Sequence, residues 1–204
     1  MIKIKNQPYN SVWISADTQD ELGNTFLRFQ EFYESPNPDF KNKIFTVGQV
    51  RAWYSEKYGA DTYHSDWTGF NFPSYVLAPF RQGLFDPLTK EETILLDYLR
   101  YRYDNFYIIG AQDKATLRHE LAHALYASDV IYKRKIDQLC YKFQKDLKVC
   151  YEYILEKGYH KDVIYDELQA YITDNEDEFI IKNLPKKIID LFNKTYNIHN
   201  KANI

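Results

Sequence analysis

The stretch that decides the fold is DKATLRHELAHALYAS, residues 113–128. Its apolar residues recur every three to four positions, which is the period of a helix that buries one side. Asp113 stands just before this run, where its carboxylate can accept hydrogen bonds from the free amides of a first helical turn. We therefore expect a helix from residue 114 to about Ser128. The side that faces the core comprises Leu117, Leu121, Ala124 and Leu125.

Two histidines of this helix are expected on one face. His119 and His123 lie four positions apart, which separates them by about 40° around a helix axis. Two imidazoles placed in this way can bind one metal ion, and the HExxH pattern is typical of zinc sites. Glu120 is expected beside the metal without binding it, where its carboxylate can take a proton from water. The spacing predicts a zinc cofactor, two histidine ligands and Glu120 as the general base.

A catalytic zinc ion needs a third protein ligand, which the motif does not contain. The motif is not followed by the glycine and third histidine of the metzincin pattern. A further helix is expected over residues 161–173. There Glu167 is followed one turn later by the small Ala170, which would allow a close approach to the metal helix. Glu167 is the expected ligand, and Asp166 and His160 are the alternatives.

The two cysteines are expected as free thiols. Cys140 and Cys150 fall in one long helix expected from Asp129 to Gly158. Ten residues of helix separate two Cα atoms by about 15 Å, beyond the roughly 7 Å that a disulfide allows. A structural zinc site using both thiols fits the sequence less well, because their spacing is unlike that of a zinc finger and leaves Glu120 without a role.

The residues before the motif predict a mixture of helices and strands. Thr18, Thr46 and Thr89 each begin a capping-box pattern, which predicts helices that end near residues 34, 59 and 103. Strands are expected at residues 11–15 and 105–110. The strand pattern is weaker near residues 62–64 and 75–77, where two further strands are expected. After Asp113 the chain is expected to be helical, with its last helix over residues 186–194.

These elements predict the α+β fold class. We expect a single domain over residues 1–204. It would comprise a mixed N-terminal part with a small sheet, residues 1–104, and a mainly helical catalytic part, residues 105–204. The second part would contain the active-site helix.

Part of the chain resembles the gluzincin metallopeptidases. Residues 117–125, LRHELAHAL, look like their metal helix, and residues 167–170, ELQA, look like the later helix that supplies a glutamate ligand. The resemblance covers about residues 105–175 and implies a zincin-like arrangement. It also implies that the strand before the metal helix pairs with substrate. That strand would present Tyr107, Ile108 and Ile109.

The expected activity is that of a zinc metallopeptidase, a hydrolase that cuts a peptide or protein substrate. Glu120 would activate the water, and Tyr171, one turn after Glu167, would donate to the oxyanion. The alternative is a regulatory or binding module with the same fold and little or no general proteolytic activity. Hydrolysis of a non-peptide amide is a third reading. The pattern does not indicate a substrate specificity or an oligomeric state.

The composition of the chain indicates which classes of partner to expect. The formal net charge is -3 and the charges are mixed along the chain, so neither nucleic acid nor an anionic membrane is expected as the main partner. No run near the N-terminus has the length of a signal peptide, and no segment has the length of a membrane span. We expect a soluble protein that is cytoplasmic, or exported without a cleavable signal peptide.

Overall fold

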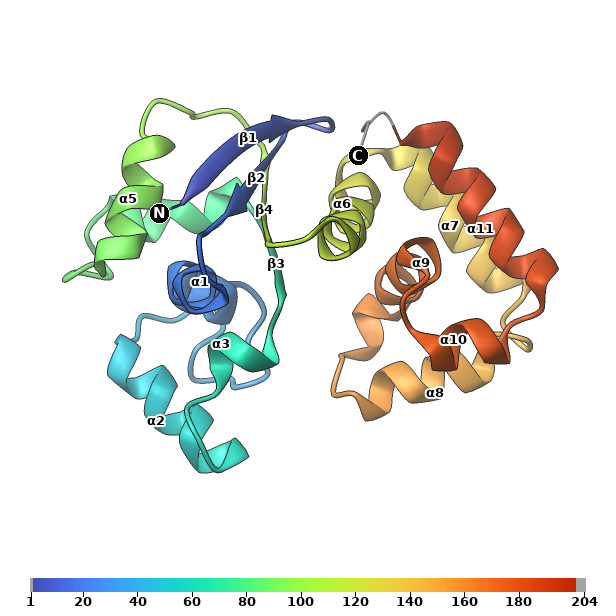
Figure 1. Ribbon diagram of the computed structural model, residues 1–204, viewed down its shortest axis with the longest axis horizontal. Coiled ribbons are helices and arrows are strands. Elements are labelled where there is room, and N and C mark those ends of the chain that lie inside the picture. Colours follow the sequence, from blue (N-terminus) through green and yellow to red (C-terminus); the bar gives the residue numbers. More distant parts are fainter. Residues whose placement is uncertain (1, 201–204) are drawn as a thin grey trace. The chain divides into compact units, whose positions relative to one another are not determined.

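The computed structural model describes residues 2–200, and the chain divides into two compact units, residues 1–112 and 113–204. The described part of the first unit combines a small sheet with helices, and that of the second contains only helices and turns (Figure 1). The fold is therefore mixed α and β, as expected. The boundary follows residue 112, so the strand that we assigned to the catalytic part belongs to the sheet of the first unit.

The sheet has four strands in the order β1-β2-β4-β3. Their bounds are Lys3–Gln7 (β1), Ser11–Ser15 (β2), Gly69–Pro73 (β3) and Tyr107–Ala111 (β4). β2 and β4 run parallel, and the two outer pairs are antiparallel. All five residues of β4 are buried. A strand that is buried on both faces of a sheet has a continuous apolar run in its sequence, as β4 has. The strands expected at residues 11–15 and 105–110 are confirmed.

The helices of the first unit begin at the expected caps. Thr18 accepts from the amide of Glu21, and Thr46 and Thr89 each form a complete capping box. The bounds are Gln19–Glu34 (α1), Val47–Tyr58 (α2), Tyr63–Asp66 (α3), Ser74–Val76 (η1), Leu77–Arg81 (α4) and Lys90–Tyr98 (α5). α5 ends before residue 103, where we expected its end.

Two expected strands are wrong. Thr62 precedes α3 and residues 63–64 lie in it, and residues 75–77 lie in η1 and α4. The true strand, β3, lies between them, and Phe70 and Phe72 point into the core while Asn71 is partly exposed. This alternation has the period of a strand. Several phenylalanines complete the core around it, and the Cβ of any larger residue at Gly110 would lie 2.6 Å from the Phe26 ring.

The second unit is built around α6, Lys114–Ser128, which packs against α9, Ile164–Asp174 (Figure 1). The other elements are Val130–Lys142 (α7), Lys148–Glu156 (α8), Lys161–Val163 (η2), Glu178–Asn183 (α10) and Lys186–His199 (α11). The Asp113 carboxylate accepts from the Thr116 amide at 2.9 Å. The four apolar residues expected on the inner side of α6 are all buried, so the expected helix, its cap and its orientation are confirmed.

The long helix expected after residue 129 is wrong, because it is divided into α7 and α8. Cys140 and Cys150 therefore lie on different helices. Both are free, as expected, and both are buried. The turn between the helices lets both thiols reach the interior of the unit. No glycine or proline marks it, which is why the sequence pattern missed it.

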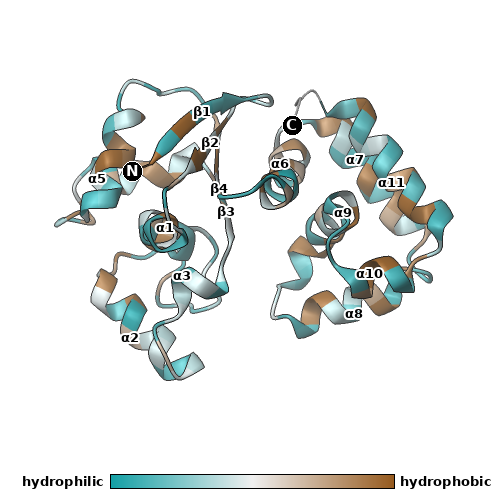
Figure 2. Ribbon diagram, viewed as in Figure 1, coloured by the Kyte–Doolittle hydropathy of each residue, from teal (hydrophilic) through white to brown (hydrophobic). Residues whose placement is uncertain are grey.

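The last helices extend beyond what we expected. α10 was not predicted, and α11 continues to His199. Figure 2 shows polar and apolar residues alternating along α11, whose buried residues are Ile188, Phe192 and Tyr196. Among residues 2–200, no helix combines the length and apolar character needed to cross a bilayer.

Candidate metal centre

Three potential metal ligands meet between α6 and α9. One ligand atom from each of His119, His123 and Glu167 lies within 4.8 Å of the others. His123 Nε2 and Glu167 Oε1 are 3.8 Å apart, close to the roughly 3.4 Å between two ligand atoms of a tetrahedral zinc ion. The exposed fractions of these side chains are 15%, 5% and 12%. The group is mostly buried and lies wholly within the second unit.

The Glu167 carboxylate is the part of this group that most clearly fits a cation. Its Oε2 atom is buried and makes no hydrogen bond. Burial raises the pKa of Glu167 to about 7, although the charges of His123 and His119 lower it. A buried carboxylate oxygen without a donor is costly, and a metal ion would satisfy it. Two imidazoles and a carboxylate are also a donor set that catalytic zinc uses, with a fourth position left for water or substrate.

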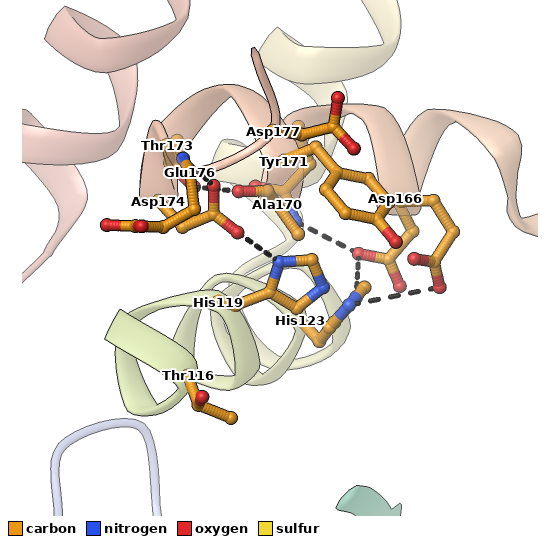
Figure 3. A network of polar contacts seen from close by, with 12 residues as sticks. Thr116, His119, His123, Asp166, Ala170, Tyr171, Thr173, Asp174, Glu176 and Asp177 are labelled. Carbon is orange, nitrogen blue, oxygen red and sulfur yellow. Dashed lines mark hydrogen bonds and ion pairs between the residues drawn. The ribbon is translucent and has the colours of Figure 1, made fainter. Parts of the chain in front are cut away.

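Each histidine of the group is held by an aspartate through the ring nitrogen that faces away from the ligand set. His119 Nδ1 donates to Asp174 Oδ2 at 2.6 Å, and His123 Nδ1 donates to Asp166 Oδ1 at 2.8 Å (Figure 3). Both Nε2 atoms are thereby left as acceptors toward a metal, the arrangement usual for metal-binding histidines. Burial lowers the pKa of His123, but the charges of Asp166 and Glu167 raise it more, and the net pKa lies well above its usual range.

The two other candidates for the third ligand have different partners. Asp166 Oδ1 is bound by His123 and also accepts from Gln169 Nε2 at 3.0 Å. His160 caps η2, with 69% of its side chain exposed, and lies near Asp162. The structure thus groups Glu167 with the two histidines, and it makes Asp166 the residue that orients one of them.

Glu120 is buried on α6 and is not one of the three grouped residues. Its negative charge contributes to raising the pKa of His123 and of Glu167. The Glu120 charge therefore acts on both groups.

Two tyrosines adjoin the ligands. The Tyr171 ring packs edge-on against the His119 ring, with 4.9 Å between centroids, and its hydroxyl lies 3.1 Å from that of Tyr159. Burial raises the pKa of both hydroxyls, so both keep their protons and can donate hydrogen bonds. We did not predict Tyr159. Its nearest signal is Gly158, whose φ of +97° marks the turn that returns the chain toward α9.

Asp174 was also missed by the sequence reasoning. It is the last residue of α9, and its Oδ1 accepts from the Glu176 amide at 2.9 Å. Its partner, His119, is far away in sequence. Only the packing of α9 on α6 brings the two together, and no short motif could have revealed the pair.

The expected role of Tyr107, Ile108 and Ile109 in pairing with substrate is wrong. These residues lie in β4, which is bonded to β2 on one side and to β3 on the other. An added strand needs an unpaired edge, and β4 has none. The edges of the described sheet are β1 and β3.

Comparison with protein families, curated proteins and solved structures gives no match to this chain. The assignment of the site therefore depends on the geometry and chemistry of its own residues.

Proposed function

We propose that the second unit carries the active site of a zinc-dependent metallopeptidase of the gluzincin type, with α6 as its zincin-like metal helix. The observation that carries the proposal is the group of His119, His123 and Glu167, whose ligand atoms lie within 4.8 Å of one another. The unpartnered oxygen of Glu167 and the aspartate behind each histidine support the same reading.

In this proposal, His119, His123 and Glu167 hold the zinc ion. When bound, zinc makes water acidic enough to supply a nucleophile near neutral pH and polarises a carbonyl group. Glu120 accepts the proton of the attacking water on its carboxylate and returns it to the nitrogen of the leaving amine. Peptide-bond cleavage then balances without another reactant, since one water molecule is consumed for each bond.

The hydroxyl groups of Tyr171 and Tyr159 lie 3.1 Å apart, and the Tyr171 ring contacts His119. One of them would donate a hydrogen bond to the oxygen of the scissile carbonyl as it gains negative charge. Such a donor typically accelerates an acyl-transfer step by about 10² to 10³. Tyr171 was our expectation for this role, and its contact with the His119 ring supports it.

The proposal is tested by comparing the wild type with Glu120→Gln on a library of peptides. The substitution preserves the size of the side chain and removes its basicity. We expect the wild type to cleave peptides and the variant to retain about 10⁻² to 10⁻⁴ of the wild-type rate. Both proteins should bind the same amount of zinc.

Cleavage by Glu120→Gln at the wild-type rate would contradict the role of Glu120. A zinc-loaded wild type that cleaves no peptide would favour the binding-module reading.

A further inference from the structure

We propose that Tyr132 and Gln169 are positioning residues for the metal centre, forming a relay through Asp166 that holds the proton of His123 on Nδ1. This inference rests on the metal site of the proposed function, but it does not depend on peptidase activity. Before any metal arrives, the relay would hold the His123 ring with Nδ1 against Asp166 and Nε2 toward Glu167.

The relay is a continuous chain of hydrogen bonds across three helices. Tyr132 on α7 donates its hydroxyl proton to Gln169 Oε1 at 2.6 Å. Gln169 on α9 donates from Nε2 to Asp166 Oδ1 at 3.0 Å. The same Asp166 oxygen accepts from Nδ1 of His123 on α6 at 2.8 Å. Tyr132 and Gln169 are fully buried, so water does not compete for the bond between them.

The chemistry of the amide gives the relay a direction. An ionised carboxylate only accepts hydrogen bonds, and a glutamine side chain offers one oxygen acceptor and one nitrogen donor group. If the amide of Gln169 were reversed, its oxygen would face Asp166 Oδ1 and two acceptors would repel. The Tyr132 hydroxyl secures the correct orientation by donating to Oε1. Asp166 then presents an acceptor to His123, whose proton must sit on Nδ1.

The two aspartates behind the histidines are held in different ways. The Asp174 carboxylate is fixed by a backbone amide, that of Glu176. Asp166 lies in the first turn of α9, and its Oδ1 is bound by the side chain of Gln169. The relay therefore acts on His123, and His119 serves as an internal reference for any experiment on it.

Two side chains of α11 pack against the Tyr132 ring. This ring lies 6.4 Å from that of Tyr196 and 5.5 Å from that of His199, both on α11. Asp129, the N-cap of α7, accepts from His199 Nδ1 at 2.9 Å. The position of the Tyr132 hydroxyl is thus fixed by the packing of α11 against α7. A buried polar chain of this kind specifies one arrangement because every member needs its partner.

The test uses NMR of nitrogen-15-labelled imidazole rings in metal-free protein, which reports whether Nδ1 carries a proton and how strongly that proton is hydrogen-bonded. In the wild type we expect a hydrogen-bonded Nδ1 proton on both His119 and His123. Tyr132→Phe removes one hydroxyl and Gln169→Leu removes the amide. Both variants should weaken the hydrogen bond of the His123 Nδ1 proton and leave that of His119 unchanged. Tyr151→Phe is the matched control, because the Tyr151 hydroxyl donates to the Cys140 carbonyl outside the relay.

A second measurement is zinc affinity by competition with a chelator. Loss of the partners that orient a ligand weakens metal binding by about 10- to 100-fold, and we expect about 10-fold for Tyr132→Phe and no change for Tyr151→Phe. If the hydrogen bond of the His123 Nδ1 proton and the zinc affinity are both unchanged in Tyr132→Phe, the relay is refuted. If Gln169→Leu does not fold, Tyr132→Phe alone decides. If the wild type binds no zinc, the proposed function fails, and the NMR measurement still decides the relay.

Discussion

Glu167→Gln should have opposite effects on the stability of the protein with and without zinc. The substitution keeps the shape of the side chain and removes a carboxylate that is buried and has one oxygen without a hydrogen bond. Without metal, this carboxylate opposes folding, because burial favours its neutral form. With metal, it is a ligand. The variant should therefore be the more stable protein in chelator and the less stable one in zinc.

The size of the first effect follows from the pKa of Glu167, which burial raises from 4.5 to about 7. A difference of one pKa unit corresponds to about 1.4 kcal/mol, so the ionised carboxylate costs about 3 kcal/mol of folding free energy. In the unfolded chain, the Glu167 carboxyl group loses its proton as the pH rises through 4.5. In the folded protein, it keeps this proton until about pH 7. In chelator, the gain in stability of Glu167→Gln over the wild type is therefore absent in acid. It grows between these two pH values and is complete at about pH 8.

The assay is urea denaturation in chelator at about pH 5 and pH 8, repeated with excess zinc at the higher pH. Zinc adds to stability in proportion to the logarithm of its concentration over the dissociation constant, so the wild type should gain more from zinc than the variant. Glu178→Gln is the matched control, since Glu178 is 83% exposed and pairs only with Lys182 four residues later in the contacts described. A Glu167→Gln variant that is less stable than the wild type in chelator at both pH values would refute the reasoning.

Three further predictions concern packing, orientation and catalysis. Leu121→Ala removes a fully buried side chain from α6 and should cost about 2–5 kcal/mol; an unchanged thermal midpoint would reject this placement. Asp174→Ala removes the partner of His119 Nδ1 and should weaken zinc binding by about 10- to 100-fold, which chelator competition would measure and equal affinity would contradict. Tyr171→Phe preserves the ring against His119 and should lower kcat by about 10² with zinc content unchanged, whereas an unchanged kcat would assign the donor role elsewhere.

Helix α6 could be predicted from the sequence because its signals are local. The cap at Asp113, the apolar residues of α6 and the spacing of His119 and His123 all act within a few turns of one helix. Glu167 required a weaker argument, from the small residue at position 170. The structure groups Glu167 with the two histidines because α9 packs on α6.

The rest of the site could not be predicted, because it depends on distances between helices. Asp174, Tyr159 and the relay partner Tyr132 meet their partners only after the helices of the second unit pack. The division of α7 from α8 has no glycine or proline to mark it. The same limit explains the error over β4, because a buried strand in the sequence does not reveal how many neighbours it pairs with.

The most direct test of the central claim is a crystal structure of the zinc-loaded protein with anomalous diffraction measured at the zinc absorption edge. We predict one strong peak at about 2.0–2.2 Å from His119 Nε2, His123 Nε2 and a carboxylate oxygen of Glu167, with Asp174 and Asp166 still bound to the two Nδ1 atoms. A peak bound by Asp166, by Glu120 or by the cysteines, or no peak between α6 and α9, would contradict the account.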